Sequence, residues 1–81
     1  MDEIFELREQ FSVCQFFADG SNEYVCRFVD VVEALTTFRR CCHSVGARIG
    51  TTTRVIITDM LDCTNAEWRH GQGITYPPKP N

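Results

Sequence analysis

Arginine is concentrated in one acid-free window of the sequence. No carboxylate occurs between Glu33 and Asp59, and the window holds four of the chain's seven arginines: Arg39, Arg40, Arg48 and Arg54. Since the formal net charge of the chain is −3, a window of +4 leaves −7 on the remaining residues. Guanidinium groups make bidentate contacts with phosphate and carboxylate. We therefore expect a surface that binds an anion or an acidic partner, made by Arg39, Arg40, Arg48, Thr51, Thr52 and Arg54. The alternative is that these arginines face the acidic remainder of the fold or a twofold mate.

Cysteine and histidine offer a second kind of chemistry. They occur together in Cys41-Cys42-His43, with Cys14, Cys26, Cys63 and His70 elsewhere. Adjacent helical residues point about 100° apart and no Cys-x-x-Cys pair exists, so the spacing argues against zinc and we expect no metal. The same divergence separates Cys42 from His43 as a nucleophile and its base. We expect no catalytic residues, no cofactor and no enzymatic activity.

Two further patterns give little support for catalysis or nucleotide binding. Asp59, Asp62 and Glu67 lie near predicted turns, where acids usually form solvated surfaces. The segment 46–52 lacks the Gly-Lys-Ser/Thr ending of a phosphate loop and follows a helix instead of preceding one. Any anion bound there would depend on arginine side chains and backbone N–H groups.

Composition limits the class of protein. A chain of 81 residues with 43% hydrophobic residues predicts one globular domain over 1–81, and no apolar run approaches the ~20 residues that span a bilayer. The start of the chain lacks the basic and apolar regions of a secretory signal, which predicts a cytoplasmic protein, in the host cell if a phage encodes it. With Lys79 as the one lysine, nucleic-acid contact is expected only locally.

The elements that position these residues can be read from the hydrophobic pattern. Aromatic and β-branched residues in 11–17 and 23–29 flank a turn at 18–22 and predict a β-hairpin, with Cys14 opposite Cys26 as two thiols or, alternatively, a disulfide. Both faces of this hairpin are apolar. A single helix covers one face, so the other needs the N-terminal segment or another subunit. The aromatic residues expected at an interface are Phe16, Phe17, Tyr24, Trp68 and Tyr76.

A helix is expected after this hairpin. Asp30 and Glu33 have the spacing of a capping box, and Gly46 is expected to end the helix. Its apolar face is predicted to comprise Val31, Ala34, Leu35, Phe38, Cys41, Cys42 and Val45, with Thr37 among its solvent-facing residues.

The C-terminal half predicts strands. A loop over 47–52 leads to strands at 54–58, 66–70 and 74–76. The predicted fold is α+β, with a small antiparallel sheet of four strands, or five with an extra edge strand, and one helix packed across it in the order ββαββ. Residues 1–10 form an N-terminal arm or short helix, and 77–81 a flexible Pro-rich tail.

Several segments resemble small uncharacterised single-domain proteins carried in bacterial and phage genomes. The resemblance lies in Phe16-Phe17 through Asp19-Gly20, Arg27-Phe28-Val29-Asp30, Arg54 to Asp59, and Glu67-Trp68-Arg69-His70-Gly71 through Pro77. It implies no established activity. It does suggest an analogy with phage-borne inhibitors of host defence complexes, such as anti-CRISPR proteins.

Two functions follow as expectations. The first is a small non-enzymatic binding or regulatory protein, a homodimer that engages a macromolecular partner through its charge-segregated surface. The second is a small anion-binding or nucleotide-binding protein that uses Arg48, Arg54 and residues 51–53.

Overall fold

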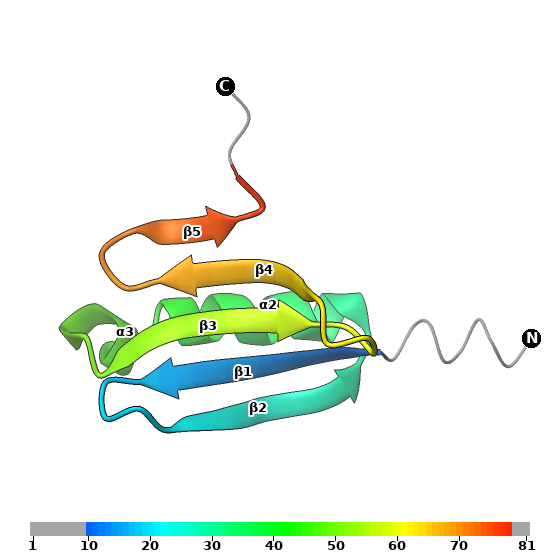
Figure 1. The fold of residues 1–81 in the computed structure, drawn as a ribbon, viewed down its shortest axis with the longest axis horizontal. Coiled ribbons are helices and arrows are strands. Elements are labelled where there is room, and N and C mark those ends of the chain that lie inside the picture. The colour runs from blue at the N-terminus through cyan, green and yellow to red at the C-terminus, as the bar shows by residue number, and fades with distance from the viewer. Residues whose placement is uncertain (1–9, 79–81) are drawn as a thin grey trace, which may run out of the picture.

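The computed structural model describes residues 10–78, which form one five-stranded antiparallel sheet with two helices on one side (Figure 1). The elements are β1 (Phe11–Phe17), β2 (Asn22–Val29), α2 (Val31–Cys42), α3 (Val45–Ile49), β3 (Thr52–Thr58), β4 (Thr64–Arg69) and β5 (Gly73–Tyr76). The strand order is β2-β1-β3-β4-β5. This confirms the α+β class, but five strands and two helices replace the predicted four and one. The predicted N-terminal arm lies outside the described residues except for Gln10, and the predicted tail is described only at Pro77 and Pro78.

The β1–β2 hairpin closes in a different register from the predicted one. Cys14 lies opposite Tyr24, and Cys26 lies opposite Val13, so the expected Cys14–Cys26 pair is wrong. The turn sets this register: Phe17 donates its N–H to the carbonyl oxygen of Ser21 at 2.8 Å, and the pairs that follow bring Cys14 opposite Tyr24. Two register shifts, between Phe11 and Val13 and between Val13 and Cys14, then place Cys26 opposite Val13, and all five cysteines are free thiols.

Helix α2 begins where its capping residue predicts. The Asp30 side chain accepts a hydrogen bond of 2.8 Å from the N–H of Glu33, which satisfies one of the free donors of the first turn. The helix packs against β1, β2 and β3. The core between helix and sheet contains Val13, Ala34, Phe38, Cys41, Val55 and Ile57. Complete burial of an aliphatic side chain such as Val13 stabilises the fold by roughly 1.5–3 kcal/mol.

The buried stripe of α2 is narrower than predicted and is rotated. Thr37, expected to face solvent, is 4% exposed, whereas Val31, Leu35 and Val45 are exposed. The helical period alone therefore predicted a buried stripe that was rotated about the helix axis from the observed one. The residues of α2 that contact the sheet lie around Ala34, Thr37 and Cys41. The exposed residues Val31 and Leu35 lie on the solvent side of the helical layer.

A second helix replaces the predicted loop over 47–52. Ser44 caps α3 by accepting from the N–H of Ala47 at 3.1 Å, and Gly50 ends it with φ +91°. Gly46, expected to end the first helix, lies inside α3. A Cβ atom there would lie 2.7 Å from Oγ1 of Thr52, so this glycine permits a close approach between α3 and the start of β3. None of the described helices is long and apolar enough to cross a membrane.

Candidate functional site

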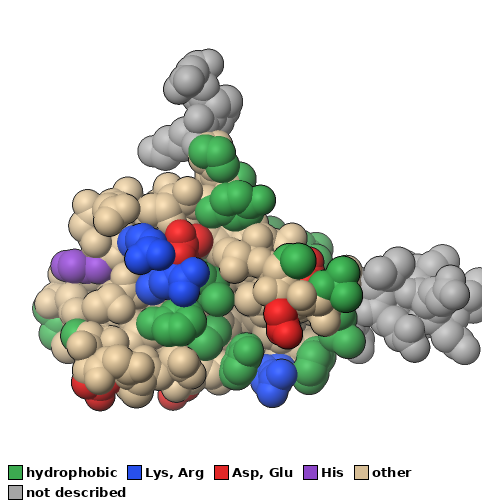
Figure 2. Space-filling model, in the orientation of Figure 1, with side chains coloured by type: hydrophobic (Ala, Val, Ile, Leu, Met, Phe, Trp, Pro, Cys, Tyr) green, Lys and Arg blue, Asp and Glu red, His purple; other side chains and the backbone are tan. Residues whose placement is uncertain are grey.

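The side of the sheet turned away from α2 carries no described helix, and we call it the open face. Residues directly opposite each other on paired strands share a face. Since Val13, Val55 and Ile57 contact the helix, the intervening residues point to the open face: Cys14, Phe16, Tyr24, Arg54, Ile56, Glu67 and Tyr76. Figure 2 views this face, where a group of charged side chains lies next to hydrophobic ones. Aromatic and charged side chains are therefore exposed on this second side of the sheet, whereas Cys14 and Ile56 are buried.

The middle of the open face is an ion-pair network centred on Glu67. Its carboxylate accepts from Nε of Arg54, lies 3.2 Å from Nη2 of Arg69, and accepts from the hydroxyl of Thr75 at 2.6 Å. The Glu67 side chain is 13% exposed. The Thr75 hydrogen bond first, and then the two guanidinium groups, lower the pKa of Glu67 below its ordinary value. Two arginines around one carboxylate leave this centre with one net positive charge.

Aromatic rings on this side of the sheet lie against arginine side chains. The Arg54 guanidinium carbon is 4.9 Å from the ring centroid of Phe16. The Arg27 guanidinium carbon is 4.3 Å from the ring centroid of Tyr24 and 4.8 Å from that of Phe28. Such cation–π contacts hold the guanidinium groups flat against the sheet. Tyrosine and arginine are the side chains most enriched at protein interfaces.

The open face is polarised along its central strands. Arg54 and Arg69 lie opposite each other at one end of the β3–β4 pair. The loop over 59–63, at the other end, carries Asp59 and Asp62 with two apolar neighbours. Five residues of strand separate Arg54 from Asp59, which corresponds to about 17 Å. One end of the central pair is therefore cationic and the other acidic.

The β3–β4 loop is ordered by Asp59 and presents apolar side chains. The Asp59 carboxylate accepts from the N–H groups of Leu61 and Cys63 and from the side-chain amide of Asn65, at 2.8, 3.1 and 3.1 Å. These hydrogen bonds, that of Asn65 first, lower the pKa of Asp59. Met60 and Leu61 are 58% and 83% exposed. The loop thus holds two large hydrophobic side chains in solvent at the acidic end of the sheet.

The structure distributes the predicted arginine surface over both sides of the molecule. Arg39, Arg40 and Arg48 are exposed on the helical layer, whereas Arg54 lies on the open face. Together with His43, the three helical arginines occupy a part of α2 and α3 that contains no carboxylate. The arginines of the acid-free window therefore belong to two separate cationic surfaces. For Arg54 the alternative interpretation applies, since it pairs with a carboxylate of the same chain.

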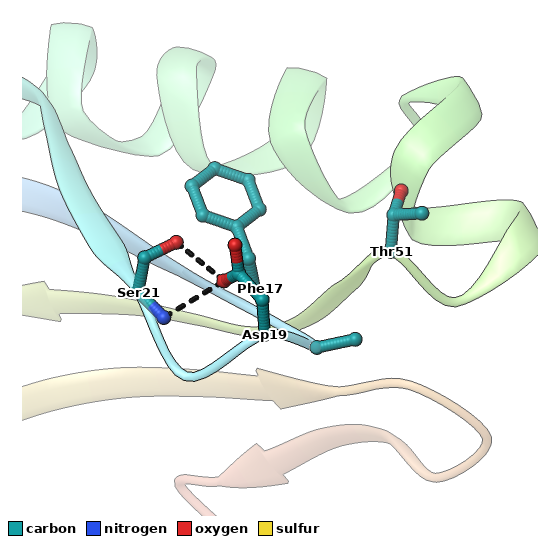
Figure 3. Close-up of a pocket in the computed structure, with 5 residues that line it drawn as sticks. Phe17, Asp19, Ser21 and Thr51 are labelled. Atoms are coloured by element: carbon teal, nitrogen blue, oxygen red, sulfur yellow. Dashed lines mark hydrogen bonds between the residues drawn. The ribbon is translucent and has the colours of Figure 1, made fainter.

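The two predicted threonines have structural partners. Thr52 is 3% exposed, and Thr51 donates its hydroxyl to the carbonyl oxygen of Gly46 at 3.3 Å. Thr51 also lines a shallow pocket at the tip of the β1–β2 hairpin with Phe17, Asp19 and Ser21 (Figure 3). Asp19 accepts from the hydroxyl and the N–H of Ser21, and these bonds lower the pKa of its carboxyl group. The pocket that Thr51 lines is thus also lined by a carboxylate.

The predicted interface aromatics also divide between the two sides. Phe16, Tyr24 and Tyr76 lie on the open face. The ring of Phe17 rises toward the helices (Figure 3), and Trp68 packs against the core beneath α2. Sequence reasoning missed Arg69, Thr75 and the central role of Glu67. Alternation along β4 could have placed Glu67 and Arg69 on one face, but their partner on β3 depends on a register shift between Ile57 and Thr58.

Cys42 and His43 do not form a nucleophile–base pair through a hydrogen bond. Cys42 is half-buried near the end of α2, and His43 is the exposed residue that follows the helix. Burial and the neighbouring Cys41 raise the pKa of the Cys42 thiol to about 12. Among residues 10–78, no group of three or more His, Cys, Asp or Glu side chains is arranged to hold a metal ion.

Comparisons with known proteins add no assignment: no family model matches the chain, and neither the curated proteins nor the solved structures gave a significant match. Any function is therefore argued from the two surfaces described above.

Proposed function

We propose that this chain is a non-enzymatic binding protein that forms a homodimer through the open face and engages an acidic macromolecular partner through its helical layer. The observation that carries the proposal is that one side of the sheet presents aromatic and arginine side chains, with no helix of residues 10–78 covering them. A sheet face with exposed aromatic side chains gains stability from a second packing layer. A second copy of the chain supplies that layer.

The faces of the sheet suit association better than its edges. β2 is an edge strand with register shifts, and Phe28 within it has φ +57°. The other edge strand, β5, has four residues and is followed by Pro77, which cannot donate a backbone hydrogen bond. Irregular or short edge strands oppose edge-to-edge pairing. These features favour a face-to-face contact.

The charge pattern of the open face is complementary to itself. A twofold axis in the plane of the interface, perpendicular to the strands, would place the Arg54–Arg69 end of one copy over the Asp59–Asp62 end of the other. The exposed Leu61 of each copy would then approach the aromatic residues of its mate. An isologous interface of this kind closes as a dimer.

The helical layer supplies the surface for the acidic partner. Arg39, Arg40 and Arg48 are exposed there, and the sequence from Ala34 to Thr58 contains no carboxylate. Charge complementarity steers such partners and rejects cationic ones. Cytoplasmic inhibition of a host defence complex is one context for this binding, and it rests on the resemblance to phage-borne proteins alone.

Anion or nucleotide binding is the second candidate and has weaker geometric support. Arg48 and Arg54 lie on different sides of the sheet, and Asp19 lines the pocket that contains Thr51. An anion at Thr51 would therefore meet a carboxylate and only one of the two arginines.

The dimer is tested by light scattering coupled to size exclusion at about 100 µM chain. The double variant Leu61→Ser with Tyr76→Ser truncates exposed side chains of the open face, and we expect it to raise the dimer dissociation constant at least tenfold. Val32→Ser with Val45→Ser is the matched control, because both valines are 69% exposed on the helical layer. A monomeric wild-type chain, or equal weakening by both double variants, would refute the dimer.

A further inference from the structure

The described helices cover only part of one side of the sheet. α2 packs against β1, β2 and β3 and α3 against β3, whereas neither helix packs extensively against β4 or β5. The helix side of the β4–β5 hairpin is therefore left beside α2 without a covering element among the described residues. In Figure 1, the hairpin extends beyond the helix on one side of the sheet.

A groove runs along this boundary, and we call it the helix-side groove. It is lined by Phe38, Arg39, Cys42 and His43 from the end of α2 and by Trp68 and Ile74 from the hairpin. Its floor is apolar, since Phe38 is buried, Trp68 is half-buried against the core and Ile74 is 42% exposed. The groove therefore offers hydrophobic surface that the fold itself does not cover.

The polar side chains at the groove include the Arg39 guanidinium and the His43 imidazole. Arg39 and His43 are exposed on its helical wall. No carboxylate among residues 10–78 lines it, because Glu67 of β4 points to the open face and the acid-free window covers α2 beyond Glu33. An apolar floor with a cationic wall selects an apolar segment flanked by acidic side chains.

The dimensions of the layer specify the conformation of that segment. Neighbouring strands lie about 4.8 Å apart, and α2, which packs against β2, β1 and β3, is centred near β1, so β4 is displaced from it by two strands, or about 9.6 Å. Packed helices lie roughly 8–10 Å apart. A helix centred over β4 would therefore contact α2 at a normal interhelical distance and would extend the layer.

We propose that the helix-side groove binds an amphipathic helix of a partner protein, with an apolar stripe facing Trp68 and Ile74 and Asp or Glu facing Arg39 and His43. This inference rests on the binding role proposed above and names the chemistry of the partner. The mode is helix-in-groove recognition, read by the partner's residues at i, i+3 or i+4 and i+7. The groove and the open face lie on opposite sides of the sheet.

The test uses a displayed library of 14-residue helical peptides, randomised on their surfaces and selected against the full chain. We expect enriched peptides to carry an apolar stripe flanked by Asp or Glu. Because Trp68 is the chain's only tryptophan, their binding should also shift its fluorescence emission. The variants Ile74→Glu and Arg39→Glu should each weaken binding at least tenfold, and Val32→Glu, exposed at the other end of α2 and outside the groove, should change it less than twofold.

Three results would overturn the inference: no enriched peptide, enrichment of neutral or basic peptides, or equal binding to the wild type and to Ile74→Glu. Circular dichroism of each variant checks that the fold is retained. Light scattering on the same samples separates the two proposals. If the chain is a dimer but selects no acidic helix, only the groove proposal is refuted. If the chain is a monomer that binds such a helix through Ile74, only the dimer proposal is refuted.

Discussion

Arg54 donates from Nε to the carboxylate of Glu67 on the neighbouring strand, and the same guanidinium group lies over the ring of Phe16. One arginine thereby links the central strands β1, β3 and β4 across the open face. Arg69 and Thr75 bring further contacts to the same carboxylate. The face is consequently a fixed arrangement of charge and aromatic surface, which suits it to a defined contact.

Replacement of Glu67 by Gln should lower the free energy of unfolding at pH 7 by about 1 kcal/mol, because Arg54 and Arg69 would lose their shared counter-ion in a partly exposed network. The folded-state pKa of Glu67 is lowered, so its contribution is present above the ordinary value of 4.5 and is lost as the pH falls through the lowered one. Denaturant unfolding between pH 3 and 7 should therefore show a shallower acid dependence in the variant. Asp62→Asn is the control, and an acid dependence equal to wild type in Glu67→Gln would contradict the assignment.

Gly50→Ala should destabilise the fold more than Gly20→Ala. Both glycines have φ +91°, which costs an L-residue roughly 1–2 kcal/mol. A Cβ atom at Gly50 would also lie 3.2 Å from Nε2 of His70, whereas nothing lies within 4 Å of one at Gly20. Thermal unfolding measures the difference. In a His70→Ala background the two substitutions should cost the same, and a persistent difference would assign the effect to another contact.

Asp30→Ala should destabilise the chain by about 1 kcal/mol, because the N–H of Glu33 loses its acceptor at the start of α2. Thr36→Ala is a suitable comparison within the same helix. The Thr36 hydroxyl bonds to the carbonyl oxygen of Val32, but alanine is the better helix former, so this change should stay within about 0.5 kcal/mol. Urea unfolding that ranks the two in the opposite order would rule out the capping role.

Alkylation at pH 8 should modify Cys63 first. Cys63 is exposed, whereas burial raises the pKa of the Cys14, Cys41 and Cys42 thiols. At a pKa of about 12, only about one Cys42 in ten thousand is a thiolate at pH 8. Mass spectrometry after a short iodoacetamide pulse should find the label at Cys63, and Cys63→Ser should remove the fast phase. Fast labelling of Cys42 would instead revive a nucleophilic role for it.

Local signals in the sequence predicted the elements better than their pairing. The spacing of Asp30 and Glu33 identifies the start of α2, and alternation identifies the first hairpin, because both depend on neighbours in the chain. The register of that hairpin is set at its turn, where Phe17 donates its N–H to the carbonyl oxygen of Ser21. The sequence marks residues 18–22 as a turn but does not show which pair of residues closes it, and this is why Cys14 was paired with the wrong residue.

The candidate surfaces were predictable to a similar extent. The arginine window is visible in the sequence, as is the need to cover a second apolar face. The division of the arginines between two surfaces follows from the placement of β3 in the middle of the sheet, with Arg54 directed away from the helices. Likewise, Thr37 is buried because of where α2 rests on the sheet. Both results depend on how the elements pack against one another, and no local pattern in the sequence shows this.

The β4–β5 hairpin is the shared wall of both proposed binding surfaces. Glu67 and Tyr76 face one side of the sheet, while Trp68 and Ile74 face the other. A displacement of this two-stranded wall by one occupant would therefore change the site offered to the other. By thermodynamic linkage, if the helical partner changes the affinity of dimerisation by some factor, dimerisation changes the affinity for the partner by the same factor. Dimerisation of this 81-residue chain and its binding of a helical partner would in this way be coupled.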